Sequence, residues 1–181
     1  MKFSGLFQYC AVCGAKELVQ NNFKSVRCEK CGFIYYINPS AATAAFIRND
    51  TGDLLVCRRA NDPAKGTLDL PGGFIDYDET AEQGIAREIL EETGIRITSA
   101  KYVFSLPNDY IYSGLDIPTM DLFFECETDD YSRISAADDV AECFFLPVRE
   151  INPALFGLKS IKTAVRIYIE THEGKKDIFL A

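Results

Sequence analysis

Three glutamates lie close together in this sequence, at the spacing that gathers side chains on one face of a helix. Glu88, Glu91 and Glu92 stand at positions i, i+3 and i+4, so at about 100° per residue they fall within one narrow arc. A solvated helix face would alternate such acids with lysine, but only Arg87 is close by in the sequence. Like charges at this spacing repel one another, and a divalent cation with oxygen ligands would turn repulsion into binding. The spacing therefore predicts a divalent cation site.

A second group of residues, near the N-terminus, is typical of a different metal. Two Cys-x-x-Cys pairs are each followed by a glycine and are separated by fourteen residues. The glycines allow tight turns around a tetrahedral ion, and this spacing predicts a zinc ribbon. Four thiolates would close the coordination sphere, so we expect a structural Zn²⁺ with no position for a substrate water. The predicted ligands are Cys10, Cys13, Cys28 and Cys31.

The acids need a rigid element to hold them, and the sequence around them has clear helix boundaries. Thr80 with Gln83 three residues later forms a capping-box pattern, and Gly94 is a typical left-handed stop. Upstream, the Pro-Gly-Gly sequence at residues 71–73 predicts a loop whose backbone can approach a ligand closely. We expect a helix that packs on a sheet while its acids border a cleft. The apolar face that would pack comprises Ile85, Ala86, Ile89 and Leu90.

The segment from Gly73 to Ile95 resembles the signature of the Nudix hydrolase superfamily. It reads Gly-x5-Glu-x7-Arg-Glu-U-x-Glu-Glu-x-Gly-U, where U is a bulky aliphatic residue, and every fixed position is filled. The resemblance implies an α/β fold, the Nudix α/β/α sandwich with a mixed sheet, and hydrolysis of a nucleoside diphosphate linked to another moiety. By position it implies that Mg²⁺ or Mn²⁺ would be held by Glu88, Glu91, Glu92 and the Gly73 carbonyl, with Arg87 and Glu79 orienting them.

Segments rich in Val, Ile, Phe or Tyr predict the sheet of such a domain. The expected strands span residues 41–48, 54–59, 96–106, 118–127 and 142–146. The segment 157–171 has helical apolar spacing and should cover the second face of the sheet. We therefore expect two domains, a zinc ribbon over residues 1–38 and a Nudix hydrolase domain over residues 39–181.

The acid that would activate a water is left open by these patterns. The reaction needs a carboxylate that is not fully engaged by metal, and Glu91, Glu92 or an acid from outside the helix could serve. Glu142 precedes an expected strand, where related enzymes often supply an extra acid, and the alternative is an exposed strand-entry residue. The acids of segment 128–139 have no helical or alternating spacing, which predicts a solvated connection.

The substrate is the least specified feature of the sequence. A zinc ribbon followed by this signature is the order seen in the NADH pyrophosphatase branch, and residues 102–107 resemble the start of that branch's specificity motif. The match ends at Asn108, and the chain contains no tryptophan, so ADP-ribose or another ADP-linked diphosphate stays open beside NADH. Tyr110 and Tyr112 could stack on an adenine or face the core.

Composition limits the remaining classes of function. The 181 residues are 48% hydrophobic with a net charge of −8, and no apolar run approaches the ~18 residues of a membrane span. The N-terminus lacks the hydrophobic region of a signal peptide, so we expect a cytoplasmic protein with reduced cysteines and no membrane partner. The expected ligand is a nucleotide-derived small molecule, and the assembly could be a homodimer. Small buried hydrophobes are expected at Cys57, Cys126 and Cys143.

Two other functions fit the same sequence. A Nudix-like domain can sense a nucleotide and regulate a partner, although the intact acids argue against that interpretation. Zinc ribbons often contact nucleic acid, but basic residues such as Lys16, Lys24 and Arg27 are scattered here and interrupted by Glu17 and Glu29. The sequence therefore favours hydrolysis over sensing and does not favour nucleic-acid binding.

Overall fold

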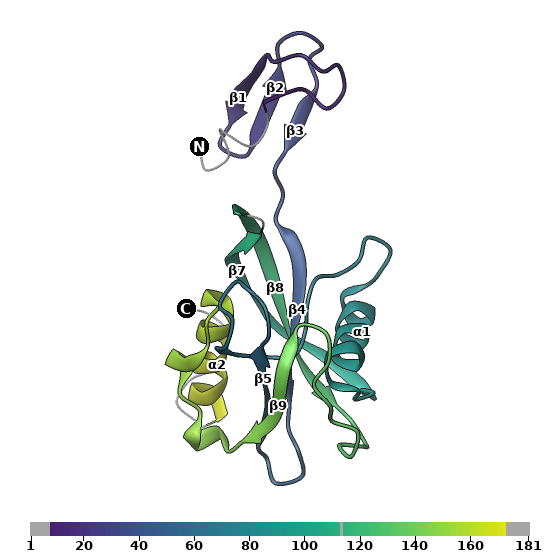
Figure 1. The fold of residues 1–181 in the computed structure, drawn as a ribbon, viewed down its shortest axis with the longest axis vertical. Coiled ribbons are helices and arrows are strands. Elements are labelled where there is room, and N and C mark those ends of the chain that lie inside the picture. The colour runs from purple at the N-terminus through teal and green to yellow at the C-terminus, as the bar shows by residue number, and fades with distance from the viewer. Residues whose placement is uncertain (1–7, 113, 173–181) are drawn as a thin grey trace. The chain divides into compact units, whose positions relative to one another are not determined.

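The computed structural model describes residues 8–112 and 114–172, and the chain divides into two compact units that meet between Pro39 and Ser40. The first unit is a three-stranded antiparallel sheet of β1 (Leu18–Asn22), β2 (Ser25–Cys28) and β3 (Ile34–Tyr36), shown in Figure 1. Its buried residues within the described range are few, namely Cys10, Ser25, Val26 and Cys28. Such a small core supplies little stability, so a unit of this size needs a bound ion or a crosslink.

The second unit contains two three-stranded sheets and two α-helices. The first sheet has the order β4-β8-β7, with β4 parallel to β8 and β7 antiparallel to it, so it is mixed. The second sheet has the order β6-β5-β9 and is antiparallel. Short 3₁₀ segments at Val148–Glu150 and Pro153–Leu155 lead into the last helix. The bounds are β4 (Ser40–Ile47), β5 (Leu54–Arg59), β6 (Leu68–Asp69), α1 (Ala81–Thr93), β7 (Ser99–Tyr112), β8 (Leu115–Glu127), β9 (Val140–Leu146) and α2 (Lys159–His172).

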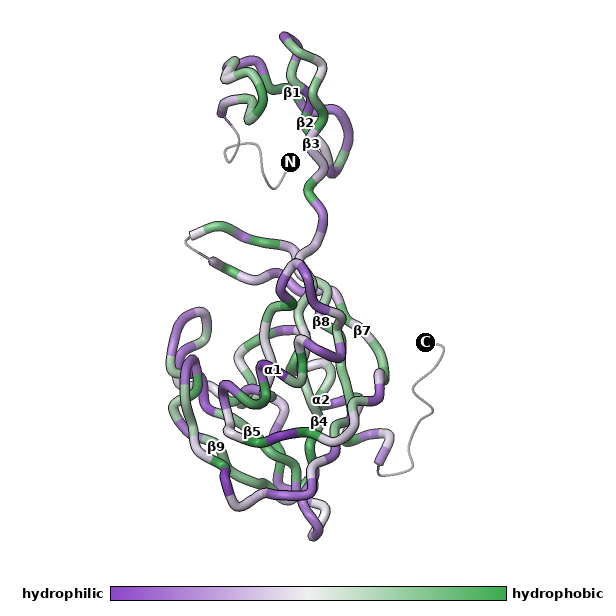
Figure 2. Tube along the Cα trace, turned by 90° about the vertical axis from the view of Figure 1, so that its right-hand side faces the viewer, coloured by the Kyte–Doolittle hydropathy of each residue, from purple (hydrophilic) through white to green (hydrophobic). Residues whose placement is uncertain are grey.

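Alternate residues of the central strands pack against different helices. On β5, Leu55 lies in the cluster that contains Ile85 and Ile89 of α1, whereas Leu54 and Val56 lie in the cluster of α2. In Figure 2 these strands run largely through hydrophobic residues. A strand buried on both faces reads as a continuous apolar run. The helices therefore cover opposite sides of the strands, which gives an α/β/α arrangement (Figure 1).

The predicted helices and most strand boundaries agree with the structure within a few residues, but the hairpin of β7 and β8 is longer than expected. The sequence prediction ended the first strand at residue 106, before Pro107, whereas β7 continues to Tyr112 opposite Leu115 of β8. Because β7 is an edge strand, a proline without an N–H is tolerated there. No helix within the described ranges is long and apolar enough to cross a membrane.

Candidate metal and substrate site

Helix α1 begins and ends as the sequence predicts. The Thr80 hydroxyl accepts the Gln83 N–H, and the Gln83 side chain accepts the Thr80 N–H at 2.9 Å. At the other end Gly94 has φ 72° and its N–H donates to the Leu90 carbonyl. Both ends of the helix are therefore fixed locally, and the position of its acids depends on how the body of the helix packs.

The Pro-Gly-Gly loop lies directly against β4. The Ala45 N–H donates to the Pro71 carbonyl at 2.9 Å, and the Thr43 N–H donates to the Gly73 carbonyl at 2.8 Å. A Cβ on Gly72 would lie 2.3 Å from the Thr43 carbonyl oxygen, and Gly72 has φ 140°, so only glycine fits. This close approach carries the loop backbone past the acids of α1.

Glu92 is the buried member of the acid group. Its side chain accepts the Gly72 N–H at 2.8 Å, and only 7% of the residue is exposed. Burial raises the pKa of its carboxyl from 4.5 to about 9, and the Gly72 hydrogen bond opposes this only in part. A buried acid with so little compensation favours either a proton or a cation beside it.

Glu88 lies against Gly73, where there is no room for a side chain. A Cβ at Gly73 would approach the Glu88 carboxylate to 2.6 Å, and burial raises the pKa of this carboxyl against the opposing effect of Arg87. The Gly73 carbonyl oxygen accepts hydrogen bonds from both the N–H and the hydroxyl of Thr43. A cation bound at that carbonyl, as expected from the sequence, would therefore compete with the Thr43 hydrogen bonds.

Arg87 joins the acids into one network. Its guanidinium donates to both carboxylate oxygens of Glu79 at 2.7 and 2.9 Å, to Glu88 at 2.9 Å and to Glu91 at 3.0 Å. A fifth contact reaches the Phe74 carbonyl at 3.0 Å. The Glu79 hydrogen bonds contribute most to raising the Arg87 pKa. The acids of α1 are consequently not a bare group of repelling charges, because one guanidinium holds three carboxylates in place.

These acids line a cavity that also receives a loop the sequence did not single out. The cavity contacts Glu88, Glu91 and Glu92, together with Asp138 from the β8–β9 connection. That connection is tied to the end of α1, since the Ala137 N–H donates to the Glu92 carbonyl at 3.0 Å. Asp138 is left-handed, with φ 53°, and its charge is one of the factors that raise the Glu88 pKa.

Two sequence expectations concern acids outside α1. The segment 128–139 is largely exposed, as expected of a solvated connection, and its last two acids also border the cavity. Glu142 lies outside this lining and instead accepts a hydrogen bond from Arg58 at 3.2 Å on the exposed side of the sheet. The feature that distinguishes Asp138 is its left-handed backbone conformation, which cannot be recognised from the sequence.

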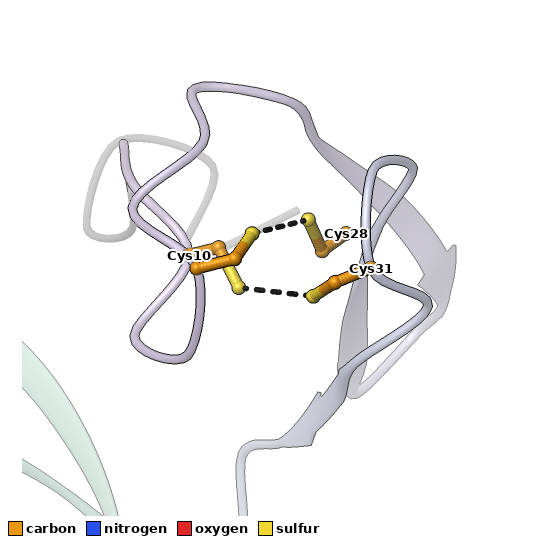
Figure 3. A group of neighbouring side chains, drawn as sticks. Cys10, Cys28 and Cys31 are labelled. Carbon is orange, nitrogen blue, oxygen red and sulfur yellow. Dashed lines mark hydrogen bonds between the residues drawn. The ribbon is translucent and has the colours of Figure 1, made fainter.

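The four N-terminal cysteines converge on one point. Figure 3 shows the sulfur atoms of Cys10, Cys28 and Cys31 facing one another from two separate loops. The sulfurs of Cys10 and Cys31 are 3.6 Å apart, those of Cys13 and Cys28 are 3.7 Å apart, and all four lie within 4.8 Å of one another. The two loops are alike, because Gly14 and Gly32 are both left-handed and each N–H donates to the carbonyl of the first cysteine at 2.9 Å.

The environments of Cys10 and Cys31 shift their pKa values in opposite directions. A backbone hydrogen bond from Cys13 is the largest of the factors that lower the pKa of Cys10 to about 7. A backbone hydrogen bond from Phe33 lowers the pKa of Cys31, but burial and the other thiols outweigh it and raise the value to about 12. Four thiolates at these separations fit Zn²⁺, which takes tetrahedral sulfur ligands.

The three remaining cysteines lie in the body. Cys57 and Cys126 are 1% and 4% exposed, as the sequence predicts for small buried hydrophobes, whereas Cys143 is half-buried. Cys57 and Cys143 are opposite each other on β5 and β9, with sulfurs 3.4 Å apart. Within the described residues, they do not belong to a group of three or more metal-ligating side chains.

Comparison with known sequences matches a family model for the NUDIX domain to residues 38–165. An ADP-ribose pyrophosphatase of Methanocaldococcus jannaschii is 41% identical over 75 residues, which cover 40% of this chain and 44% of that protein. A MutT-like protein of Streptomyces ambofaciens is 29% identical over 141 residues, covering 75% and 85% of the two chains. The NAD-capped RNA hydrolase NudC of Shigella flexneri is 31% identical over 100 residues, covering 55% and 38%. The chain thus matches less than half the length of two of these relatives.

Solved structures share the fold. The crystal structure of a NUDIX hydrolase from Nitrosomonas europaea superposes with a TM-score of 0.73 at 24% identity and covers 93% of this chain and 94% of its own. A MutT protein from Methanosarcina mazei superposes with a TM-score of 0.60 at 22% identity, covering 78% and 100%. The predicted fold class, an α/β sandwich with a mixed sheet, is confirmed.

Proposed function

Because the chain belongs to the Nudix hydrolase family, we propose that it hydrolyses a nucleoside diphosphate linked to another moiety, by attack of water on the pyrophosphate. The observation that carries this proposal is the cavity, whose lining combines the acids of α1 with polar side chains of the β7–β8 hairpin such as Asn108 and Thr119. A diphosphate at the acids would need its charge neutralised, and a cation bound by them supplies that.

The acids of α1 are the proposed ligands for Mg²⁺ or Mn²⁺. Glu88, Glu91 and Glu92 offer hard carboxylate oxygens, the donor type that these ions prefer. Glu92 fits this role best on physical grounds, because its carboxyl is buried and lacks a counter-charge of its own. When bound, such an ion polarises a phosphoryl oxygen and lowers the pKa of a water. We propose that Arg87 and Glu79 fix the orientation of the metal-binding carboxylates through the hydrogen bonds of the Arg87 guanidinium.

Water activation is assigned to an acid at the cavity that is not fully engaged by metal. Glu91 has 48% of its side chain exposed, and Asp138 enters from the neighbouring loop. Asp138 replaces Glu142 as the acid contributed from outside the helix, since Glu142 pairs with Arg58 away from the cavity. Asp138→Asn should lower turnover by roughly tenfold or more while the fold is kept. An unchanged rate would return the role to Glu91 or Glu92.

The N-terminal unit is proposed to be a zinc ribbon with a structural Zn²⁺ on Cys10, Cys13, Cys28 and Cys31. Support comes from the convergence of the four sulfurs and from the small core of this unit. A closed set of four thiolates has no open position for a water, so hydrolysis is assigned to the body alone.

The proposed substrates are ADP-linked diphosphates, with AMP as one product. The names of two relatives refer to ADP-ribose and to NAD-capped RNA, and both ADP-ribose and NAD contain ADP joined through its diphosphate to a second group.

A turnover screen with Mg²⁺ tests this proposal. The panel comprises NADH, NAD, ADP-ribose, diadenosine polyphosphates, nucleotide sugars, coenzyme A and nucleoside triphosphates, with products separated by chromatography. We expect AMP release from an ADP-linked compound and loss of turnover when the metal is withheld. Preferential release of pyrophosphate from triphosphates would overturn the substrate assignment, and tight nucleotide binding without turnover of any compound would identify a sensor.

A further inference from the structure

Besides the acids of α1, the cavity is lined by one face of the β7–β8 hairpin, which we call its hairpin end. Asn108 of β7 is paired directly with Thr119 of β8, and Tyr110 and Asp121 follow two residues along their strands on the same face. Alternate residues of a strand share a face, so these four side chains line one wall. Leu158 and Ile161, at the start of α2, contribute an apolar wall.

Most hydrogen-bond donors at this end are already used within the protein. The hydroxyls of Thr119 and Ser160 both donate to the buried Asp121 carboxylate. Arg59 donates to Asp69 at 2.6 Å, to the Pro63 carbonyl at 2.7 Å and to the Tyr110 hydroxyl at 3.3 Å. The capacity left for a ligand therefore lies in the Tyr110 hydroxyl, which accepts from Arg59 and keeps its own O–H, and in the side-chain amide of Asn108.

One acceptor is without a partner. Asn108 is only 5% exposed, and its Oδ1 atom is buried with no hydrogen bond from any residue in the ranges 8–112 and 114–172. A buried amide oxygen in this state costs free energy that a ligand N–H would recover. Asn108 also lines the cavity, so a molecule bound there could supply that N–H once the amide turns Oδ1 toward the cavity.

The charged side chains around this end of the cavity determine which part of a substrate can bind there. Among the residues described, the cavity is lined by two arginines and no lysine, and Arg59 and Arg87 are both paired with carboxylates. Asp69 and Asp121 add negative charge, which would repel a phosphate. The walls suit a flat ring, since Tyr110 packs edge-on against Phe74 with ring centres 5.4 Å apart.

We propose that this end of the cavity recognises a nucleobase through its exocyclic amine, which donates to Asn108 Oδ1. Asn108 is then a specificity-determining residue that selects adenine over a purine lacking the amine or carrying a carbonyl in its place. The inference rests on the proposed function for the position of the diphosphate at the acids of α1. It commits the substrate to one orientation, with the base at the β7–β8 hairpin and the diphosphate at the helix.

Binding of three nucleotides to the unmodified protein tests the proposal without requiring turnover. AMP, IMP and purine riboside 5′-monophosphate differ at position 6 of the purine, where IMP has a carbonyl with a proton on the adjacent N1 and the riboside has only hydrogen. Their affinities can be measured by isothermal titration calorimetry with Mg²⁺ present. We expect AMP to bind at least about tenfold more tightly than either analogue, because each leaves a buried acceptor unpaired. Equal affinities would overturn the proposal.

A variant at Asn108 attributes the selectivity to this residue. Asn108→Leu should reduce the preference for AMP to within about threefold, and its melting temperature should be unchanged or higher, because an apolar group replaces an unpaired acceptor. Tyr112→Leu is the matched control, since Tyr112 lies on the same strand, is exposed and lies outside the cavity lining. Equal weakening of AMP and IMP by Asn108→Leu would also overturn the proposal.

Kinetics separates failure of this proposal from failure of the proposed function. With ADP-ribose and its hypoxanthine analogue as substrates, the difference should appear mainly in KM, because the amine lies far from the reacting phosphorus. Turnover of both compounds with the same kcat/KM refutes the subsite alone. No turnover of either compound, combined with a clear AMP preference in the calorimeter, refutes the proposed function and keeps the subsite.

Discussion

The cysteine cluster and the acids of α1 both offer ligands for a cation, but the two regions are prepared for it differently. Four sulfurs already lie within 4.8 Å of one another, and within the described residues this is the one set of three or more metal-ligating side chains with that closeness. The carboxylates of α1 are spread around Arg87 and line a cavity instead. A closed set suits a permanent ion, whereas an open set can admit substrate and water.

The two regions also differ in what holds the surrounding chain. The N-terminal unit has four buried residues in its described part, while α1 buries Ile85 and Ile89 in the core of the body. Loss of a cation should therefore unfold the first region and merely inactivate the second. The predictions below test this difference.

The largest expected effect is loss of turnover when an acid of α1 is neutralised. Glu91→Gln or Glu92→Gln should lower kcat by at least about a hundredfold with saturating Mg²⁺, because each removes a charge needed for metal binding or water activation. The melting temperature should stay the same or rise, since shape is kept and like charges are fewer. Steady-state kinetics and calorimetry measure both quantities. If both variants turned over substrate at the parental rate, the assignment of this site would be wrong.

At the cysteine cluster the expected effect is on zinc and folding. The purified protein should carry one zinc per chain, and Cys28→Ser should abolish zinc binding and unfold the N-terminal unit. Elemental analysis and circular dichroism provide the measurements. Cys126→Ser is the matched control, because Cys126 is equally buried but lies in the body, and it should keep the zinc. Absence of zinc from fresh, reduced protein would count against the cluster as a metal site.

Neighbouring glycines of the Pro-Gly-Gly loop should separate folding from metal binding. Gly72→Ala places a Cβ 2.3 Å from the Thr43 carbonyl at φ 140° and should lower the free energy of unfolding by about 1–3 kcal/mol. Gly73→Ala meets the Glu88 carboxylate, which can rotate away, so the Mg²⁺ concentration for half-maximal rate should rise roughly tenfold with little change in stability. The reverse pattern would show that Gly73 serves the fold.

The buried acid of α1 should make the stability of the body depend on pH. Glu92 has a pKa of about 9 in the folded chain and a lower value when unfolded, so the folded state binds the extra proton between about pH 5 and 9. The free energy of unfolding should therefore fall as the pH rises through that window, because the folded state must give up the Glu92 proton. Without added Mg²⁺ or Mn²⁺, Glu92→Gln should gain several degrees in Tm relative to the parent from pH 5.5 to 8.5, since about 1 kcal/mol corresponds to roughly 2–4 °C. A constant difference between the two proteins would contradict this.

The smallest effect is expected at the acid that lies outside the cavity. Glu142→Gln removes a surface ion pair with Arg58, and such pairs contribute about 1 kcal/mol or less. Turnover should change by less than about twofold. A hundredfold loss would instead show that Glu142 reaches the acids of α1 during the reaction.

Sequence predicted the features that are encoded locally. The capping box at Thr80, the stop at Gly94 and the paired cysteines all depend on residues within a few positions of one another, and the structure contains each of them. The Nudix fold was predicted from one such segment and is confirmed.

Features that depend on contacts between distant segments were not predicted. Asp138 reaches the cavity because its loop is hydrogen-bonded to the carbonyl end of α1, and residues 128–139 carry no pattern that indicates this. The hairpin beyond Pro107 depends on β7 being an edge strand. The unpaired Asn108 oxygen is visible only once both strands of the hairpin are in place.

The guanidinium of Arg87 has a further consequence for how the site is loaded. It acts as an internal counter-ion that holds Glu79, Glu88 and Glu91 in place without an external cation. A cation bound by Glu88 and Glu91 would exchange with these hydrogen bonds, which rotations of the side chains could accomplish. Loading and release would then occur on the timescale of rotamer changes.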